Sequence, residues 1–165
     1  MSSVELATML ERIASDNPGI HSVTVVRHGT LVLDTRVSPF AHGDRHDSHS
    51  WTNGVLSALV GIAIDRGDLL DLDTRVLDFF PGYEIAQLDK GKRALTLGHL
   101  LTMSAGLKTE DSYLYNWEGL DRLHDTDDAI QYMLDLEMAY KPGSRFEYTN
   151  GVSHLLSCMI TEATG

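Results

Sequence analysis

The feature that most constrains the fold is a helix-length segment in which apolar residues fill almost every position. Residues 54–64 contain no charged side chain and only one serine, Ser57. Apolar side chains therefore lie on nearly every face of a helix here, as in helices that are buried all round. Gly67 follows as the expected C-terminal cap. The sequence predicts a helix over 50–65 that other elements must cover on all sides.

The rest of the chain offers few strands and several helices for this cover. Ser2 and Glu5 form a capping-box pattern that predicts a helix over 3–15. Alternating apolar residues on either side of His28-Gly29 predict two strands, at about 21–27 and 30–36. A polar loop is expected over 39–49. Further helices are expected over 73–80, 97–103, 126–136 and 151–164, the first three capped by Asp73, Thr96 and Thr126.

These elements predict an α+β fold in which an N-terminal helix and β-hairpin precede a mainly helical region. We expect one domain over 1–165, with 1–38 in the sheet layer and 39–165 in the helical region. An isolated two-stranded ribbon is marginal in water, so something should cover or extend the hairpin. Self-association as a homo-oligomer, or pairing with a missing C-terminal half, would do so.

Charge and length exclude several classes of function. The 13 Lys and Arg residues face 24 Asp and Glu residues, a net charge of -11 that repels nucleic acids and anionic membranes. The N-terminus has no secretory-signal pattern, and 54–64 is shorter than the roughly 20 residues that cross a bilayer. We expect a cytoplasmic protein. Cys158 is the only cysteine, and although His154 lies one turn earlier as a possible base, packing is the favoured role for this thiol.

Ser50 opens the apolar helix, and Asn53 lies one helical turn further on. A serine at this place is ordinarily an N-cap, and the same holds for Asn150 before the last helix. The segment 50–67, however, resembles the first motif region of the class C β-lactamase, penicillin-binding protein, D-alanyl-D-alanine carboxypeptidase and esterase family, whose motif is Ser-x-x-Lys. Similar segments follow in order at 72–81, 97–107 and 142–151. The last contains Tyr148-x-Asn150, which looks like the family's second motif, Tyr-x-Asn.

The resemblance implies acyl transfer from a lactam, a D-alanyl peptide or an ester to Ser50, without a metal or organic cofactor. In the family motif the lysine shares a helix face with the serine and activates its weakly nucleophilic hydroxyl. The resemblance makes Tyr148 the partner that relays the proton, and Asn150 a residue that hydrogen-bonds to the substrate or within the proton network. It also implies a partial β-lactamase-like, DD-peptidase fold that lacks the C-terminal strands.

Two departures from the family pattern predict impaired activity. Asn53 stands in place of the motif lysine, and an amide neither takes up a proton nor carries charge. Losing a general base commonly lowers a rate by about 10² to 10⁴. The third motif, Lys-Thr-Gly or His-x-Gly on a strand well beyond the second motif, has no counterpart before Gly165, the last residue of the sequence. His28-Gly29 is not that motif, because it lies in the N-terminal hairpin.

Two other functions remain open. The first is a non-catalytic module that binds a peptide-like or acyl ligand without turning it over, or that mediates oligomerisation. The second is a metal site in the polar loop, which contains histidines and aspartates at close spacing. Its candidate ligands are His42, Asp44, His46, Asp47 and His49.

Overall fold

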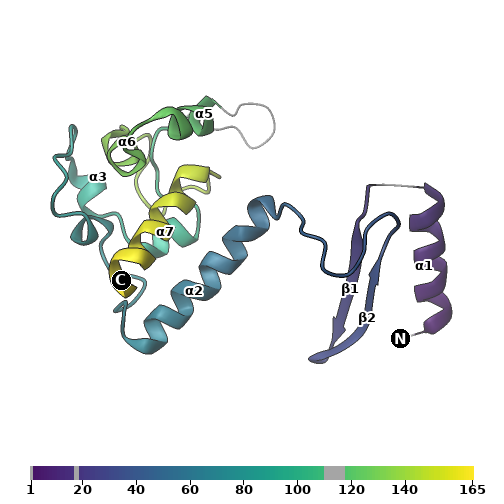
Figure 1. Cartoon of the computed structure of the whole chain (residues 1–165). Coiled ribbons are helices and arrows are strands. Elements are labelled where there is room, and N and C mark those ends of the chain that lie inside the picture. Colours follow the sequence, from purple (N-terminus) through teal and green to yellow (C-terminus); the bar gives the residue numbers. More distant parts are fainter. Residues whose placement is uncertain (1, 17–18, 110–117) are drawn as a thin grey trace. The chain divides into compact units, whose positions relative to one another are not determined.

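The computed structural model describes residues 2–16, 19–109 and 118–165, and the chain divides into two compact units, Met1–Asp47 and Ser48–Gly165. The first unit holds helix α1 (Ser3–Asp16) and an antiparallel hairpin of β1 (Ser22–Arg27) and β2 (Thr30–Arg36) (Figure 1). All three elements were predicted from the sequence, and the fold class, α+β, is confirmed.

Local chemistry accounts for the first unit. The backbone N–H of Glu5 donates to Ser2 Oγ at 3.4 Å, which is the first half of the predicted capping box. His28 and Gly29 make the tight turn with φ angles of 50° and 74°, so this pair belongs to a hairpin turn, as expected. Among the described residues of this unit, none is fully buried.

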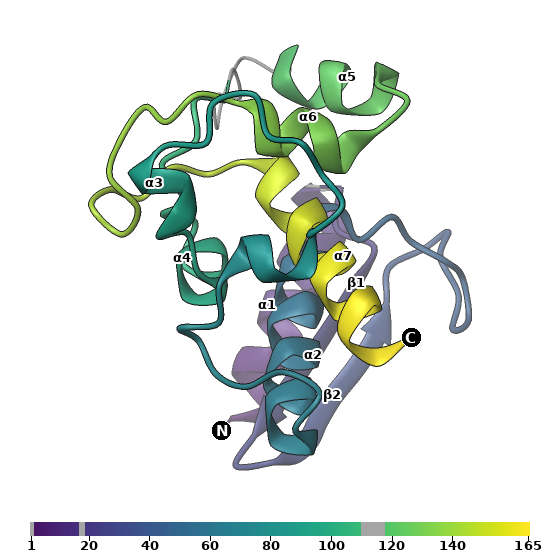
Figure 2. The ribbon, with the colours of Figure 1, turned by 90° about the vertical axis from the view of Figure 1, so that its left-hand side faces the viewer.

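The second unit contains the remaining helices. Their bounds are η1 His49–Trp51, a 3₁₀ turn, then α2 Thr52–Arg66, η2 Val76–Phe79, α3 Lys90–Arg93, α4 Leu97–Leu101, α5 Glu118–Asp125, α6 Ala129–Asp135 and α7 Asn150–Thr164. Helix α7 is central, because α2, α4, α5, α6 and η2 all contact it (Figure 2). No helix in the described part of the chain is long and apolar enough to cross a membrane.

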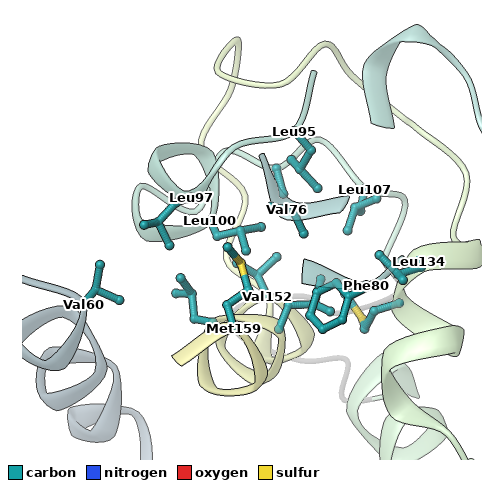
Figure 3. Close-up of a cluster of buried hydrophobic side chains, with 14 of the residues drawn as sticks. Val60, Val76, Phe80, Leu95, Leu97, Leu100, Leu107, Leu134, Val152 and Met159 are labelled. Atoms are coloured by element: carbon teal, nitrogen blue, oxygen red, sulfur yellow. The ribbon is translucent and has the colours of Figure 1, made fainter. Parts of the chain in front are cut away.

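The core of the second unit gathers on one side of α7. Val152, Leu155 and Met159 of α7 have exposed fractions of 0%. Around them lie apolar side chains of the neighbouring helices and turns, among them Val60 of α2 and Leu100 of α4 (Figure 3). Burial of such side chains supplies the main stabilisation of this unit.

The prediction that the apolar helix is covered on all sides is wrong for residues 48–165. Helix α2 buries Val60 and Ala63, whereas Val55, Leu59 and Ile62 are 38%, 41% and 53% exposed. The reason is that α7 packs against one side of α2, and no other long helix in the described part of this unit covers the rest. The predicted C-terminal cap is confirmed, since Gly67 ends the helix with φ 80°.

One of the predicted helix caps is replaced by a neighbouring residue, and another is confirmed. Asp128, not Thr126, starts α6, where its carboxylate accepts from the N–H of Gln131 at 2.9 Å. Thr96 caps α4 as predicted, with the ring of His99 taking the place of the usual Glu or Gln.

Two further differences concern short helices. The expected helix over 73–80 shrinks to η2, because Arg75 is extended and forms a β-bridge with Thr96. Helices α3 and α5 were not predicted: α3 is a single short turn, and α5 has only two apolar side chains, Leu120 and Leu123, in its eight residues.

Candidate active site

Ser50 lies in the 3₁₀ turn η1, immediately before α2. The chain runs without a break from η1 into α2, so Asn53 comes to the same side as Ser50. The residue at the N-cap position of α2 is Trp51. Ser50 is therefore not the N-cap of this helix, so helix capping does not explain a serine at this position.

Tyr148 and Asn150 reach Ser50 from almost a hundred residues further along the chain. The segment before α7 is fixed by two backbone hydrogen bonds, from Glu147 N–H to the carbonyl of Met103 at 2.7 Å and from Gly143 N–H to that of Ser104 at 2.9 Å. Thr149 is buried and extended, and it precedes α7 as the N-cap residue. Asn150 is thus the first helical residue, not the cap that its position suggested.

The four sequence-predicted residues form one hydrogen-bonded group. Ser50 Oγ and Tyr148 Oη are 2.6 Å apart. Asn53 Nδ2 donates to Tyr148 Oη at 3.3 Å, and Tyr148 Oη donates to Asn150 Oδ1 at 3.4 Å. When the phenol hydrogen is directed to Asn150, the Ser50 hydroxyl donates to the phenol oxygen. The proton of Ser50 then points at Tyr148.

A cavity of about 360 Å³ opens beside this group. Its lining comprises His49, Ser50, Asn53, Leu120 and Asn150. Sequence reasoning did not place His49 or Leu120 here. His49 was considered only as a metal ligand, although it is the chain neighbour of Ser50. Leu120 lies in α5, a short helix that was not predicted.

The arrangement can orient a serine hydroxyl toward an acyl ligand and accept its hydrogen bond. Asn53 supplies a neutral N–H to the phenol oxygen, whereas a lysine at the same place would add a positive charge that favours a phenolate. The phenol that donates to Asn150 still carries its own hydrogen, so it accepts a hydrogen bond from Ser50 but cannot accept its proton. Proton transfer from Ser50 requires the phenolate form of Tyr148, which the neutral Asn53 does not favour as a lysine would.

The other candidate residues do not join this group. Cys158 Sγ and His154 Nε2 are 3.5 Å apart on α7, but burial raises the pKa of the Cys158 thiol, which keeps it protonated. A packing role for Cys158 is consistent with this.

The five residues predicted as metal ligands in the polar loop do not come together in one cluster. In the described part of the chain no three His, Cys, Asp or Glu side chains are grouped to hold a metal ion. His42 instead faces Asp34, with 3.7 Å between Nδ1 and Oδ2, and His46 faces His21.

A family model identifies the family of the chain, and solved structures share its fold. A family model described as Beta-lactamase matches residues 11–165. No curated protein matches the chain in a sequence search.

Three solved structures share the fold. A putative 6-aminohexanoate-dimer hydrolase from Bacillus anthracis has a TM-score of 0.68 and 19% sequence identity, and the match covers 94% of this chain and 42% of that one. A putative β-lactamase from Bacteroides dorei DSM 17855 has a TM-score of 0.69 and 21% identity, with 98% of this chain and 46% of that one covered. An octameric penicillin-binding protein homologue from Pyrococcus abyssi has a TM-score of 0.68 and 21% identity, with 99% of this chain and 40% of that one covered. This chain thus spans less than half the length of each.

Proposed function

Because the chain belongs to the Beta-lactamase family, we propose that it is a serine acyl-transfer scaffold whose reactivity at Ser50 is impaired by Asn53. In this proposal Ser50 is the nominal nucleophile, and Tyr148, in its phenolate form, is the group that receives its proton. Asn150 fixes the phenol or a bound ligand, and Asn53 occupies the position of the family lysine. The ligand is an acyl compound such as a lactam, a D-alanyl peptide or an ester.

The contact between Ser50 and Tyr148 is the observation that carries this proposal. At 2.6 Å the two oxygens are as close as a strong O–H···O hydrogen bond allows. The phenol oxygen also receives the amide hydrogen of Asn53, which supports geometry but adds no charge. We therefore expect a serine that is correctly placed but slow to acylate, by about 10² to 10⁴ relative to a site with a base.

Mass spectrometry after exposure to a fluorophosphonate probe tests this. The chain as it stands should show no adduct within a time in which the Asn53→Lys variant is labelled at Ser50. The matched control is Asn53→Lys combined with Ser50→Ala, which should stay unlabelled. A further variant, Asn53→Lys with Tyr148→Phe, should label more slowly, because the phenol no longer accepts the proton.

Two results would refute the proposal. Rapid labelling of Ser50 in the unmodified chain would mean that no lysine is needed. A folded Asn53→Lys variant that remains unlabelled would mean that Asn53 is not what limits the reaction. Circular dichroism of each variant separates the second result from a loss of structure.

The cavity supports a second candidate, a binding module that holds an acyl ligand without turnover. Its volume of about 360 Å³ suits a small ligand, and its lining combines the apolar Leu120 with hydroxyl and amide groups. Thermal-shift measurements with acyl-D-alanine, β-lactam and ester ligands distinguish this role. Stabilisation without product formation favours it, and the absence of any shift opposes it.

The same proposal includes the cellular location of the protein and its binding partners. We place it in the cytoplasm, with a small acyl compound or peptide as ligand and with neither nucleic acid nor a membrane as partner. The net charge of -11 supports the exclusion of nucleic acid. The exposed apolar residues of α2 support self-association or pairing with a further protein segment.

A further inference from the structure

A pair of histidines in the first unit converges on a single point, and the pair shares no residue with the group proposed for acyl transfer. His21 precedes β1, and His46 lies 25 residues later in the loop that follows β2. Their Nδ1 atoms are 3.0 Å apart, and both residues are exposed. All the residues that form this arrangement belong to residues 1–47.

The aromatic ring of Phe40 orients both imidazoles. It stacks on His21 with ring centroids 3.8 Å apart and an angle of 27° between the rings. The same ring meets His46 edge-on at 5.2 Å. Phe40 is only partly exposed and thus gives the two histidines an apolar wall.

Hydrogen bonds fold the loop back onto the start of β1. The N–H of Val37 donates to the carbonyl of His21 at 2.9 Å, and the N–H of Phe40 donates to the carbonyl of Val37 at 3.0 Å. The carboxylate of Asp44 accepts from the N–H of Ala41 at 2.7 Å. The loop is therefore a structured turn that brings His46 opposite His21, and Asp44 is already engaged in holding it.

The distance between the two nitrogens matches that of two ligands on one metal ion. With zinc–nitrogen bonds of about 2.0 to 2.1 Å, two imidazoles on a tetrahedral ion have nitrogens about 3.3 Å apart, and a right angle at the metal gives about 2.9 Å. The observed 3.0 Å lies between these values. Without a metal, one imidazole donates the hydrogen on its Nδ1 to the Nδ1 of the other. A metal ion bound to both nitrogens would displace that hydrogen as a proton.

We propose that His21 and His46 bind a divalent transition-metal ion such as Zn²⁺ through their Nδ1 atoms. Imidazole nitrogen is a preferred ligand for this class of metal. The described residues offer no third His, Cys, Asp or Glu in the group, so water completes the coordination from the exposed side. The site takes none of its ligands from Ser50, Asn53, Tyr148 or Asn150, and it does not depend on the proposed acyl-transfer function.

Zinc titration of the full chain, prepared without an affinity tag, tests the proposal. His21→Ala and His46→Ala should each weaken Zn²⁺ binding at least about tenfold, because each removes one of two protein ligands. The matched control is His42→Ala, in the same loop, which should leave the affinity unchanged since His42 faces Asp34. Phe40→Ala should weaken binding less than either ligand variant, through loss of ring orientation.

Zinc-dependent shifts of the histidine ring resonances of the unmodified chain give a second measurement that needs no variant. Zn²⁺ should move the resonances of His21 and His46 and leave those of His28 and His42 in place. The proposal is overturned if the unmodified chain binds no Zn²⁺, if the variant lacking both histidines binds it equally well, or if other histidines respond instead.

Discussion

At the scale of single residues, Lys92 is in the environment least suited to its usual charge. Its exposed fraction is 2%, and its Nζ has no hydrogen-bond partner among the described residues. Burial lowers the pKa of Lys92 below 10.5, although the carboxylates of Asp135, Asp89 and Glu137 act in the opposite direction. A cation kept here without a hydrogen bond lowers the stability of the fold.

Replacing this lysine should therefore stabilise the protein. We expect Lys92→Met, which keeps most of the side-chain volume, to raise the free energy of unfolding at pH 7 by about 1 to 3 kcal/mol. Between the lowered folded pKa of Lys92 and 10.5 the unfolded chain retains a proton that the folded chain has lost, so stability of the unmodified protein rises with pH. The advantage of the variant should accordingly shrink as the pH approaches 10.5.

Denaturant unfolding at pH 7 and near pH 10 measures both effects. The control is Lys108→Met, since Lys108 is exposed and pairs with Glu137 at 3.2 Å on the surface. Its removal should change stability little. A Lys92→Met protein that is less stable than the unmodified one at both pH values would show that the ammonium group has a stabilising role.

At the scale of elements, the crossing of α6 and α7 depends on a glycine. A Cβ on Gly151 would overlap Met133 Sδ, and Met133 is itself buried with an exposed fraction of 1%. Gly151 follows Asn150 directly, so the same close approach also sets the position of the first residue of α7. The contact between these helices is thus linked to the geometry of the candidate active site.

Gly151→Ala should destabilise the protein by about 1 to 3 kcal/mol, because the side chain of Met133, which is buried, would have to leave its packed position. Gly54→Ala is the matched control, since a Cβ there meets nothing within 4 Å. That change should stabilise α2 by about 0.5 to 1 kcal/mol through helix propensity. Thermal unfolding of the two variants measures the difference, and equal effects would contradict the packing explanation.

At the scale of the whole molecule, the two units differ in how much core each contains. The second unit is built around α7, with side chains of several helices buried against it. The described residues of the first unit include no buried side chain, and its sheet has two strands. A ribbon of this kind is weakly stable by itself.

Hydrogen–deuterium exchange should reveal this difference directly. Backbone amides of β1 and β2 should exchange much faster than those of α7, because exchange protection follows local stability. Peptide-level mass spectrometry resolves the two regions in a single experiment. Equal protection of the hairpin and of α7 would mean that another surface covers the hairpin in solution.

Much of the secondary structure could be predicted because its signals are local. The hairpin, the N-terminal helix and the caps at Thr96 and Gly67 depend on residues a few positions apart. Asp128 and Thr126 were both local candidates for the cap of α6, and the sequence did not choose between them. The shortening of the helix after Asp73 depended on the bridge between Arg75 and the distant Thr96.

For the candidate site, the sequence alone determined the candidate residues, because its resemblance to the family indicates Ser50, Asn53, Tyr148 and Asn150. Only the tertiary structure brought Tyr148 within 2.6 Å of Ser50, through a segment tied to Met103 and Ser104. It likewise paired His21 with His46, and within residues 48–165 it packed α7 against one side of α2 only. The physical reason is that long-range packing, unlike caps and turns, depends on which distant surfaces fit together.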